Sequence, residues 1–449
     1  MMEQELKPYP EYKEIGLPWL KNIPSHWSVM RNKNVLVEKK TIVGENSTDF
    51  KLLSLTKQGV IYRDLENAKG KFPKEFSTYK IVEKNNLILC LFDLDETPRT
   101  VGISSNLGMI TGAYDVFRGL DTNMHYAYYY YLSIDNIKGL KPLYTGLRKV
   151  VKMPVFLSTK LPIPPRPEQD QIVKYLDFKL LKINKFIKDK KREIELLKEL
   201  KQAEINRAVT KGLNPNVPMK DSGIDWLGEI PEHWEVKRVK NVLIETGERS
   251  IHGDEEPLSM SQKLGLVKSS ELDIPNEASS YIGGKIVHVT DLVFNKLKAH
   301  LGVFSVSKYD GVVSPDYAVY SVFYQDNVEY LERLFKTKMY IQQFIRHSRG
   351  VAAGFRRLYT NDLFNIKIAL PKPPEQHQIY NYIINLEVKI NKAISAIESE
   401  ISLIQEYKTS IISDVVTGKV DVRDVNIEDT FDMEILEEVE DETEEVIEE

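Results

Sequence analysis

The chain has 449 residues and a mass of 51.8 kDa, enough for roughly three domains of about 150 residues each. Its apolar share of 42% and charged share of 28% are typical of a globular protein, and no apolar run approaches the roughly 20 residues that a membrane span needs. The polar N-terminus does not look like a secretory signal, and the single cysteine, Cys90, can form neither an internal disulfide nor a thiolate zinc site. We therefore expect a cytoplasmic protein without a membrane segment.

The net charge of -5 hides an asymmetry along the chain. Residues 421–449 contain fifteen Asp and Glu against the single Arg423, so residues 1–420 carry a formal charge of +9. An acidic block this dense buries little apolar surface, and we expect 421–449 to be a disordered tail. The basic remainder is compatible with a polyanionic partner such as nucleic acid.

Two halves of the chain repeat at an offset of 207 residues. The motif IPSHW at 23–27 returns as IPEHW at 230–234. A second motif, Pro-x-x-Pro-Glu-Gln-x-Gln-Ile, begins at Pro164 and again at Pro371. A shorter match, Val209-Thr210 with Val416-Thr417, keeps the same offset. Three matches in one register indicate a tandem duplication, and the period is far too long for a solenoid.

Between these matches the sequence predicts strands. Short runs rich in Val, Ile, Leu and aromatic residues are separated by Gly, Pro, Asn and Asp, a pattern typical of an irregular mixed sheet. The two halves agree in this pattern more than in their residues. We therefore expect an α+β protein with two tandem mixed α/β domains at 15–165 and 222–370.

After each proline-rich motif the apolar period becomes helical, over 166–215 and 371–420. The seam positions, spaced alternately four and three apart, include Leu176, Leu180, Ile183, Ile187, Ile194, Leu197 and Ala208, and then Ile383, Leu386, Ile390, Ala393, Ile397, Ile404, Tyr407 and Ile411. Charged residues interrupt the seams at Lys190, Lys201, Glu204 and Glu400. We expect the two helices to pair as an antiparallel coiled coil with pseudo-two-fold symmetry. The alternative, in which each helix packs only on its own domain, stays open.

The sequence offers no complete catalytic motif. The nearest approach to a phosphate-binding loop, Gly283-Gly284-Lys285, lacks the upstream glycine and the hydroxyl. Ser314-Pro315-Asp316-Tyr317 has the outline of an amino-methyltransferase turn, but no glycine-rich cofactor loop accompanies it. No acidic-x-Lys element of a nuclease follows it, and the eight histidines form no metal-binding pair. We therefore expect no catalytic residue and no metal site in this chain.

The histidine of each repeated motif lacks the sequence context of a catalytic group. No nucleophile, carboxylate or metal ligand stands at a fixed spacing from His26 or His233. We expect Trp27 and Trp234 to pack into the start of each domain's core, with the preceding proline directing the chain into its first strand.

Binding is the remaining function, and basic, polar and aromatic residues gather where the two halves diverge. Lys and Arg neutralise phosphates, while Arg, Asn and Gln can bond bidentately to base edges. For any single residue, a solvated charged surface is the alternative explanation. The candidate DNA-binding residues are Lys57, Gln58, Tyr62, Arg63, Arg99, Thr100, Arg148, Lys149, Lys152, Gln262, Lys263, Asn295, Lys296, Lys298, His300, Arg346, Arg349, Arg356 and Arg357.

Over about residues 15–420 the sequence resembles the DNA-specificity subunit of type I restriction-modification systems. The resemblance rests on IPxHWxxxxxKNVL, on the proline-rich motif before each long helix, and on WLGEIPEHWEVKRVKNVL, DLVFNKLKAHLG and DGVVSPDYAVY in the second half. It implies two target-recognition domains that each read one half of an asymmetric, bipartite site in double-stranded DNA, with paired helices setting the spacing between the halves.

The resemblance also implies partners and a division of labour. Two modification subunits would supply S-adenosylmethionine and methylate adenine, and restriction subunits would supply ATP-driven translocation and cleavage with Mg²⁺. This chain would hold no cofactor. The acidic segment 421–449 has no counterpart within the repeat. Two other interpretations stay open: a scaffold whose paired modules bind proteins, and the specificity part of a fused methyltransferase-nuclease.

Overall fold

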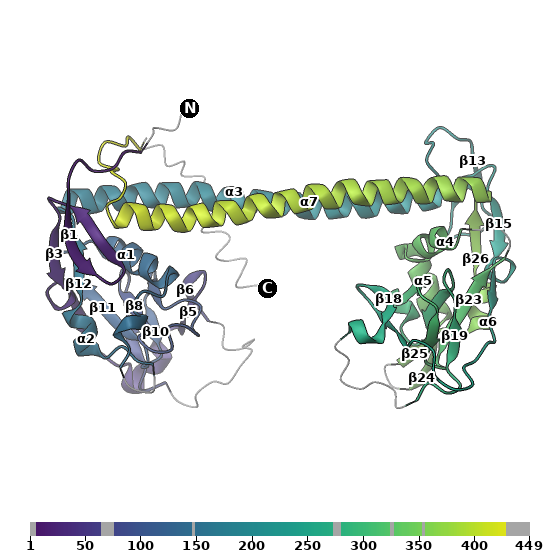
Figure 1. Ribbon diagram of the computed structural model, residues 1–449, viewed down its shortest axis with the longest axis horizontal. Helices are drawn as coiled ribbons and strands as arrows, with labels where there is room; N and C mark the ends of the chain where they lie inside the picture. Colours follow the sequence, from purple (N-terminus) through teal and green to yellow (C-terminus); the bar gives the residue numbers. More distant parts are fainter. Residues whose placement is uncertain are drawn as a thin grey trace. The chain divides into compact units, whose positions relative to one another are not determined.

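The computed structural model describes residues 6–63, 76–145, 149–272, 280–323, 327–352 and 355–427, without the side chains of 351, 352 and 355. The chain divides into two compact units. Unit 1 holds the residues up to Lys190 and those from Ser399 onward, and unit 2 holds Lys191–Glu398. Each unit therefore combines one mixed α/β part with portions of both long helices, α3 (Arg166–Lys211) and α7 (Pro373–Val416), which Figure 1 shows.

Unit 1 is built on a four-stranded antiparallel sheet in the order β4-β11-β8-β9, with helix α1 (Met124–Asn136) in contact with β8 and β9. These strands are β4 (Leu36–Lys39), β11 (Asp115–Gly119), β8 (Leu87–Leu89) and β9 (Val101–Ile103). The other strands form two-stranded pairs: β1 (Tyr12–Leu17) with β2 (Leu20–Pro24), β3 (Ser28–Arg31) with β12 (Lys160–Ile163), β5 (Leu53–Thr56) with β6 (Gly59–Tyr62), and β7 (Lys80–Val82) with β10 (Gly108–Ile110). The short helix α2 (Met153–Ser158) precedes β12.

Unit 2 repeats this arrangement strand for strand. Its four-stranded sheet has the order β16-β23-β20-β21, formed by β16 (Leu243–Glu245), β23 (Tyr317–Val322), β20 (Leu292–Asn295) and β21 (Phe304–Val306). The counterpart pairs are β13 (Met219–Asp221) with β14 (Glu229–Pro231), β15 (Glu235–Arg238) with β26 (Lys367–Leu370), β17 (Leu258–Ser261) with β18 (Gly265–Lys268), and β19 (Lys285–Val287) with β22 (Gly311–Val313). Every strand pairing in the described part of unit 1 thus recurs in unit 2.

The described part of unit 2 has three α-helices besides the long pair. Helices α4 (Val328–Phe335), α5 (Lys338–His347) and α6 (Thr360–Asn365) each contribute buried apolar side chains to the unit's core. The hairpin of β24 (Arg349–Ala352) and β25 (Phe355–Arg357) corresponds in the described part of unit 1 to an isolated antiparallel bridge between Thr145 and Val150. The two units therefore share a framework and differ in one strand pair.

The repeated tryptophans lie in the two cores, as the sequence predicted. Trp27 is 0% exposed and Trp234 is 1% exposed, each within its own unit's main apolar cluster. The cluster of unit 1 includes Val415 from the end of α7, whereas that of unit 2 includes Ala208 from the end of α3. Each core is thus completed by the last turns of a long helix.

The two long helices pair in antiparallel fashion within each unit. In unit 1, Lys408 donates to Asn184 (2.7 Å), and the seam charges Lys190 and Glu400 form an ion pair of 3.3 Å. In unit 2, Lys201 donates to Asn391 at 3.0 Å. Partner numbers on α7 fall as those on α3 rise, which confirms the expected direction of pairing.

Glu204, another seam charge, accepts a hydrogen bond from Tyr382 on α7 at 3.2 Å. Together with the pairing of Lys190 and Lys201, this contact explains why the charged seam positions are tolerated. Each finds a polar partner on the facing helix.

Most predicted seam residues are buried or half-buried, with two exceptions on α7. Ala393 is exposed, and Ile394 takes its place at 9% exposure between Ile390 and Ile397. Burying the isoleucine removes more apolar surface from water than burying the alanine methyl group, so this register is favoured. Tyr407 is likewise 39% exposed, so its assignment to the buried seam was wrong.

Both long helices end a few residues earlier than the sequence suggested. Gly212 and Gly418, which follow the last turns, have φ values of +77° and +74°. Glycine enters this left-handed region without steric cost, so it terminates each helix.

The first part of the expected acidic tail is ordered, which corrects its assignment to disorder. Asp421 forms a β-bridge with Lys7, and Val422 and Ile427 are buried in the core of unit 1. Burial of these apolar side chains is favourable, and residues 421–427 contain only two acidic residues, so little charge opposes their packing. Residues 428–449 lie outside the described residues.

The described residues also begin earlier than the predicted first domain. Tyr9 is 3% exposed and belongs to the core cluster of unit 1. None of the helices among these residues is both long enough and apolar enough to cross a membrane.

Candidate nucleic-acid interface

A glutamate at the start of each long helix joins the two repeated sequence motifs. In unit 1, Glu168 accepts hydrogen bonds from the Trp27 indole (2.8 Å) and the Tyr9 hydroxyl (2.7 Å), and its other oxygen lies 2.8 Å from His26 Nε2. Burial, and then the bond to Glu168, raises the pKa of Tyr9, so this phenol stays protonated and donates.

Unit 2 repeats this contact with the equivalent residues. Glu375 accepts from the Trp234 indole at 3.2 Å, and its other oxygen lies 2.7 Å from His233 Nε2. The expectation that the two histidines lack a carboxylate partner was therefore wrong. The partner lies 142 residues away in the chain, and the contact holds each unit's first strands against its long helix.

The next residue of the motif secures a second element. Gln169 accepts from the backbone N–H of Asn123, the N-cap of α1, and Gln376 accepts from that of Asn327, the N-cap of α4. Both glutamines also donate to a proline carbonyl five residues earlier. The Glu-Gln pair is therefore a structural anchor in both units.

Against this shared framework, cationic side chains gather at one end of the four-stranded sheet of unit 2. Lys285 pairs with Glu245, the last residue of β16, at 2.7 Å, and Arg357 pairs with Asp316, just before β23, at 2.9 Å. Lys296 follows the last residue of β20. Because neighbouring antiparallel strands alternate in direction, the end of β16, the start of β23 and the end of β20 point to the same end of the sheet. We refer to this end of the strands as the sheet edge.

The β24–β25 hairpin brings two arginines to a tyrosine beside this edge. Arg349 and Arg357 are paired across the two strands, and both lie over the ring of Tyr359, at 6.0 and 5.6 Å from its centroid. Each arginine also pairs with a carboxylate, Arg349 with Asp362 and Arg357 with Asp316, which offsets their mutual repulsion. We call Lys285, Lys296, Arg349 and Arg357 the unit 2 cation cluster.

Several polar atoms around this cluster lack hydrogen-bond partners. Of four buried side-chain atoms without a partner in the described part of the chain, three belong to His300, Arg357 and Asp362. Arg349 ion-pairs with Asp362 through the other carboxylate oxygen at 2.6 Å. Buried polar groups normally have hydrogen-bond partners, so these atoms leave donor and acceptor capacity beside the cluster.

Two groups of this region have lowered pKa values. Burial, followed by repulsion from Lys285 and Arg357, lowers the pKa of Lys296. Burial, followed by repulsion from Arg356, lowers the pKa of His300. The second cause of both shifts is a neighbouring cation, so cationic side chains lie close together here.

The same sheet edge in unit 1 has a different set of groups. Lys80 donates to Asp115, the first residue of β11, at 3.1 Å and to the carbonyl of Tyr114 at 2.6 Å. Burial raises the pKa of Asp115, although the charge of Lys80 opposes this shift. Lys80 and Lys285 each begin a Lys-Ile-Val strand, a repeated tripeptide that would have identified both lysines in the sequence but was missed.

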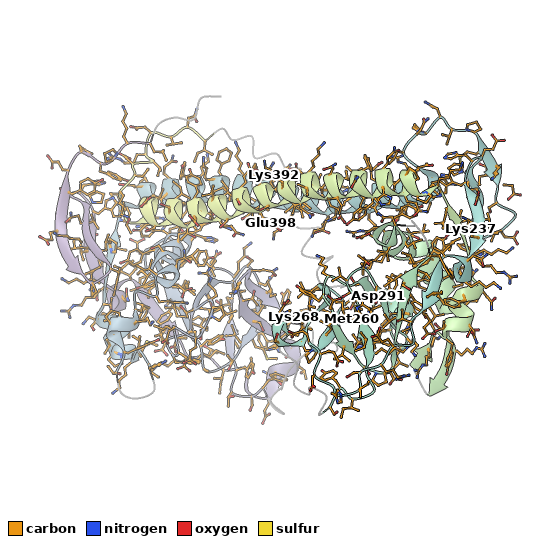
Figure 2. All side chains as sticks on the ribbon, turned by 45° about the vertical axis from the view of Figure 1, so that its right-hand side comes forward. Lys237, Met260, Lys268, Asp291, Lys392 and Glu398 are labelled. Atoms are coloured by element: carbon orange, nitrogen blue, oxygen red, sulfur yellow. The ribbon has the colours of Figure 1, made fainter. Side chains whose placement is uncertain are left out.

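Equivalent hairpin tips carry four of the predicted residues. Lys57 and Gln58 form the exposed turn between β5 and β6, and Gln262 and Lys263 form the exposed turn between β17 and β18. Both tips thus present one lysine and one glutamine, in opposite order along the chain. Figure 2 shows the second hairpin, with Met260 on β17 and Lys268 on β18.

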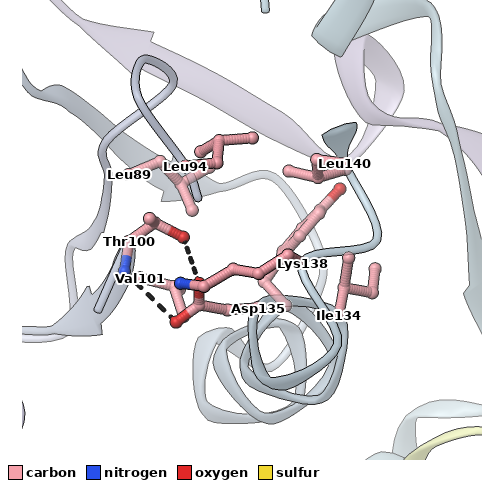
Figure 3. A pocket seen from close by; sticks show the side chains of 9 residues that line it. Leu89, Leu94, Thr100, Val101, Ile134, Asp135, Lys138 and Leu140 are labelled. Atoms are coloured by element: carbon pink, nitrogen blue, oxygen red, sulfur yellow. Dashed lines mark hydrogen bonds and ion pairs between the residues drawn. The ribbon is translucent and has the colours of Figure 1, made fainter. Parts of the chain in front are cut away.

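Arg99 and Thr100 have internal partners that explain them without DNA. The Thr100 hydroxyl donates to Asp135 at 2.6 Å (Figure 3). Arg99 pairs with the same carboxylate at 2.9 Å. Asp135 is 6% exposed and also bonds Lys138. These contacts hold α1 against β9, and we leave both residues out of the proposed interface.

The other predicted residues are scattered over the two units. Lys149 is paired with Asp95 and Glu96 at 3.2 and 3.1 Å. Asn295 accepts from the backbone N–H of Leu297 at 3.1 Å, which gives it a role in the turn after β20. Tyr62 is half-buried, and the exposed residues are Arg63, Lys152, Lys298, Arg346 and Arg356. Arg148 lies outside the described residues.

No group of three or more His, Cys, Asp or Glu side chains in the described ranges is arranged to hold a metal ion. Asp316, part of the turn that resembled a methyltransferase motif, is instead the ion-pair partner of Arg357.

Comparisons with known proteins point to one family. Residues 112–196 match the type I restriction modification DNA specificity domain. Two proteins of Methanocaldococcus jannaschii are similar in sequence, one named as the type I restriction enzyme MjaX specificity subunit (29% identity over 276 residues) and the other as the MjaVIII specificity subunit (38% over 100 residues). The first alignment covers 59% of this chain and 60% of that relative, and the second covers 22% and 21%.

Two solved structures share the fold. One is a chain from work on the complex assembly and conformational transition of a type I R-M system, with a TM-score of 0.61 and 12% identity, covering 88% of this chain and 99% of the other. The second is the HsdS subunit from Thermoanaerobacter tengcongensis, with a TM-score of 0.53 and 14% identity over 88% and 98% of the two chains. The resemblance found in the sequence and the α+β fold class are thereby confirmed.

Proposed function

We propose that this chain, which is similar to the specificity subunits of type I restriction-modification systems, selects the DNA sequence on which its partner subunits act. The target would be a bipartite, asymmetric site in double-stranded DNA. Two modification subunits would methylate adenine there, and restriction subunits would cleave unmodified DNA. In this proposal the chain works in the cytoplasm and is not itself a catalyst.

One observation carries the proposal: the two units share their anchors while differing in their candidate DNA-facing groups. The contacts of Glu168 and Glu375 are equivalent. By contrast, the sheet edge bears the cation cluster in unit 2 and the Lys80–Asp115 pair in unit 1. Two readers on one framework would recognise two different half-sites, because direct readout depends on which side chains face the bases.

The unit 2 cation cluster would serve mainly to contact phosphates. Arginine and lysine neutralise the DNA backbone and position the protein, whereas specificity comes from base-edge contacts. The exposed tip at Gln262 and Lys263 offers side chains suited to base edges, as does the tip at Lys57 and Gln58 in unit 1. The paired helices α3 and α7 would set the length of the unread gap.

Duplex binding at several salt concentrations tests this proposal against a protein-binding scaffold. Phosphate contacts release counterions, so affinity should fall steeply between about 50 and 200 mM salt. The chain should be assayed with its modification partner, on random-sequence duplex and on duplex selected from a random pool. Steep salt dependence together with enrichment of one sequence would support the proposal. Flat salt dependence, or the absence of any duplex binding, would instead favour the scaffold.

A further inference from the structure

The ordered beginning of the C-terminal segment is fixed to the first turns of α3. Gln171 donates its side-chain amide to the carbonyls of Val422 and Val425, at 3.0 and 2.9 Å. Ile427, the last described residue, is 6% exposed in the core of unit 1. The described end of the chain therefore lies beside this part of α3.

The side of α3 that continues from Gln171 is rich in lysine. Between Lys174 and Lys190 the helix has six lysines and two aspartates. An α-helix turns about 100° per residue, so Lys182 and Lys185 lie on the same side as Gln171, with Lys188 at its margin. All three of these lysines are exposed. We call Lys182, Lys185 and Lys188 the α3 lysine stripe.

This stripe lies away from the other long helix. Ile183 and Ile187, at 4% and 9% exposure, face the coiled-coil seam and are separated from the stripe by roughly half a turn. The stripe is therefore part of the outer surface of unit 1, so a polyanion could reach it without disturbing the helix pair.

The segment that follows Ile427 has the complementary charge. Residues 428–449 contain thirteen Asp and Glu and no Lys or Arg. Its 22 residues could extend roughly 75 Å at about 3.4 Å per residue, whereas the stretch of α3 from Gln171 to Lys188 is only about 26 Å long. Both reach and charge are sufficient for the segment to cover the stripe.

We propose that residues 428–449 bind back onto the α3 lysine stripe and compete there with nucleic acid. The segment is an intramolecular polyanion held close to the stripe by its anchored start, which gives it a high effective concentration. It therefore keeps this basic surface from binding DNA without regard to sequence. The inference concerns the outer face of α3, and it does not depend on which bases the two units read.

Carbodiimide cross-linking tests the contact directly, since this reagent joins a carboxylate to a neighbouring amine without a spacer. In the full chain at low salt, mass spectrometry should find residues 428–449 joined to the stripe lysines. These cross-links should weaken at about 1 M salt, where charges are screened within a few ångströms. Exposed lysines elsewhere in unit 1, namely Lys21, Lys33 and Lys160, serve as internal controls. Equal cross-linking to these controls, or none to the stripe, would overturn the proposal.

The competition is tested with random-sequence duplex and a chain that ends at Ile427. Each additional phosphate contact adds about 0.9 to the slope of log affinity against log salt, so truncation should steepen this slope by about 2.7. Replacing the three stripe lysines with glutamine in the shortened chain should remove the steepening, whereas the same change at Lys21, Lys33 and Lys160 should preserve it. If both triple variants behave alike, the segment acts only as a general repulsive charge. Because this assay needs neither a target site nor a partner, its failure leaves the proposed function standing.

Discussion

The buried indole of Trp27 donates a hydrogen bond to Glu168, 141 residues later in the chain, at 2.8 Å. Trp234 makes the equivalent bond to Glu375, so both repeated motifs meet in the same way in both units. The framework of each unit thus depends on a carboxylate at the first turn of a long helix.

Replacing Glu168 with alanine should destabilise unit 1 by about 1–3 kcal/mol, because the buried Trp27 indole and the Tyr9 hydroxyl lose their acceptor. The matched change Glu375→Ala should cost unit 2 less, since no tyrosine hydroxyl bonds Glu375 in the contacts described here. Hydrogen exchange of peptides from each unit measures the two effects separately. A loss of protection spread equally over both units in either variant would contradict this account.

Arg99→Ala should lower the stability of unit 1 without changing the sequence that is read. Arg99 bonds the buried carboxylate of Asp135, and a hydrogen bond to a charged group contributes about 1.5–3 kcal/mol. Lys138 remains to compensate in part, so the lower end of this range is expected. Denaturation measures the stability, and a methylation map of the variant measures the target. An altered half-site would show that Arg99 reads DNA after all.

Arg357→Gln should affect one half-site only. The variant keeps a polar side chain but loses the charge that lies over Tyr359, so one phosphate contact should be lost and the slope of log affinity against log salt should become shallower by about 0.9. Duplex binding with the modification partner should weaken, and any relaxed positions should fall in the half-site read by unit 2. Arg238→Gln, an exposed change on β15, is the matched control and should bind like the unaltered chain. Relaxation in both half-sites would exclude a local role.

The lowered pKa of Lys296 predicts a pH dependence of DNA affinity. Below its pKa the side chain is an ammonium that can contact phosphate, and as pH rises through this lowered pKa the charge and the contact are lost. A lysine at the reference value of 10.5 would lose them only at higher pH. The affinity of the unaltered chain should therefore begin to fall at a lower pH than that of Lys296→Arg, which stays charged. Parallel profiles of the two proteins at constant ionic strength would refute the assignment.

The spacing role of the coiled coil can be tested with paired insertions. Because α3 and α7 run antiparallel, a heptad inserted after Lys190 in α3 needs a second heptad immediately before Glu400 in α7 to preserve the facing residues. Seven residues add about 10.5 Å of helix, close to three base pairs. The gap in the target should grow by about this amount while the half-sites stay the same. An insertion in α3 alone should disrupt the pairing and is the control.

Local pattern was sufficient to predict the duplication, the strands, the two long helices and the burial of Trp27 and Trp234. It was not sufficient for contacts between distant segments. The Glu168 contact joins residues more than 140 positions apart, and nothing near either residue indicates the other. The same limit applies to Lys285 with Glu245, which meet only when separate strands share a sheet edge.

Averaging over a segment caused the error in the tail. The acidic density of 421–449 was assigned to the whole segment, although thirteen of its fifteen carboxylates come after Ile427. The apolar residues Val422 and Ile427 were the missed signal of an ordered start. In the seam, the error at Ala393 arose because positions three and four residues along a helix both lie near one face, and side-chain size decided between them.

A base-resolved map of N6-methyladenine, made with the chain and its modification partner expressed together, tests the central claim most directly. The account predicts one asymmetric motif with two specific parts separated by a gap of constant length. Methylation that is absent, scattered, or confined to a single uninterrupted motif would contradict it.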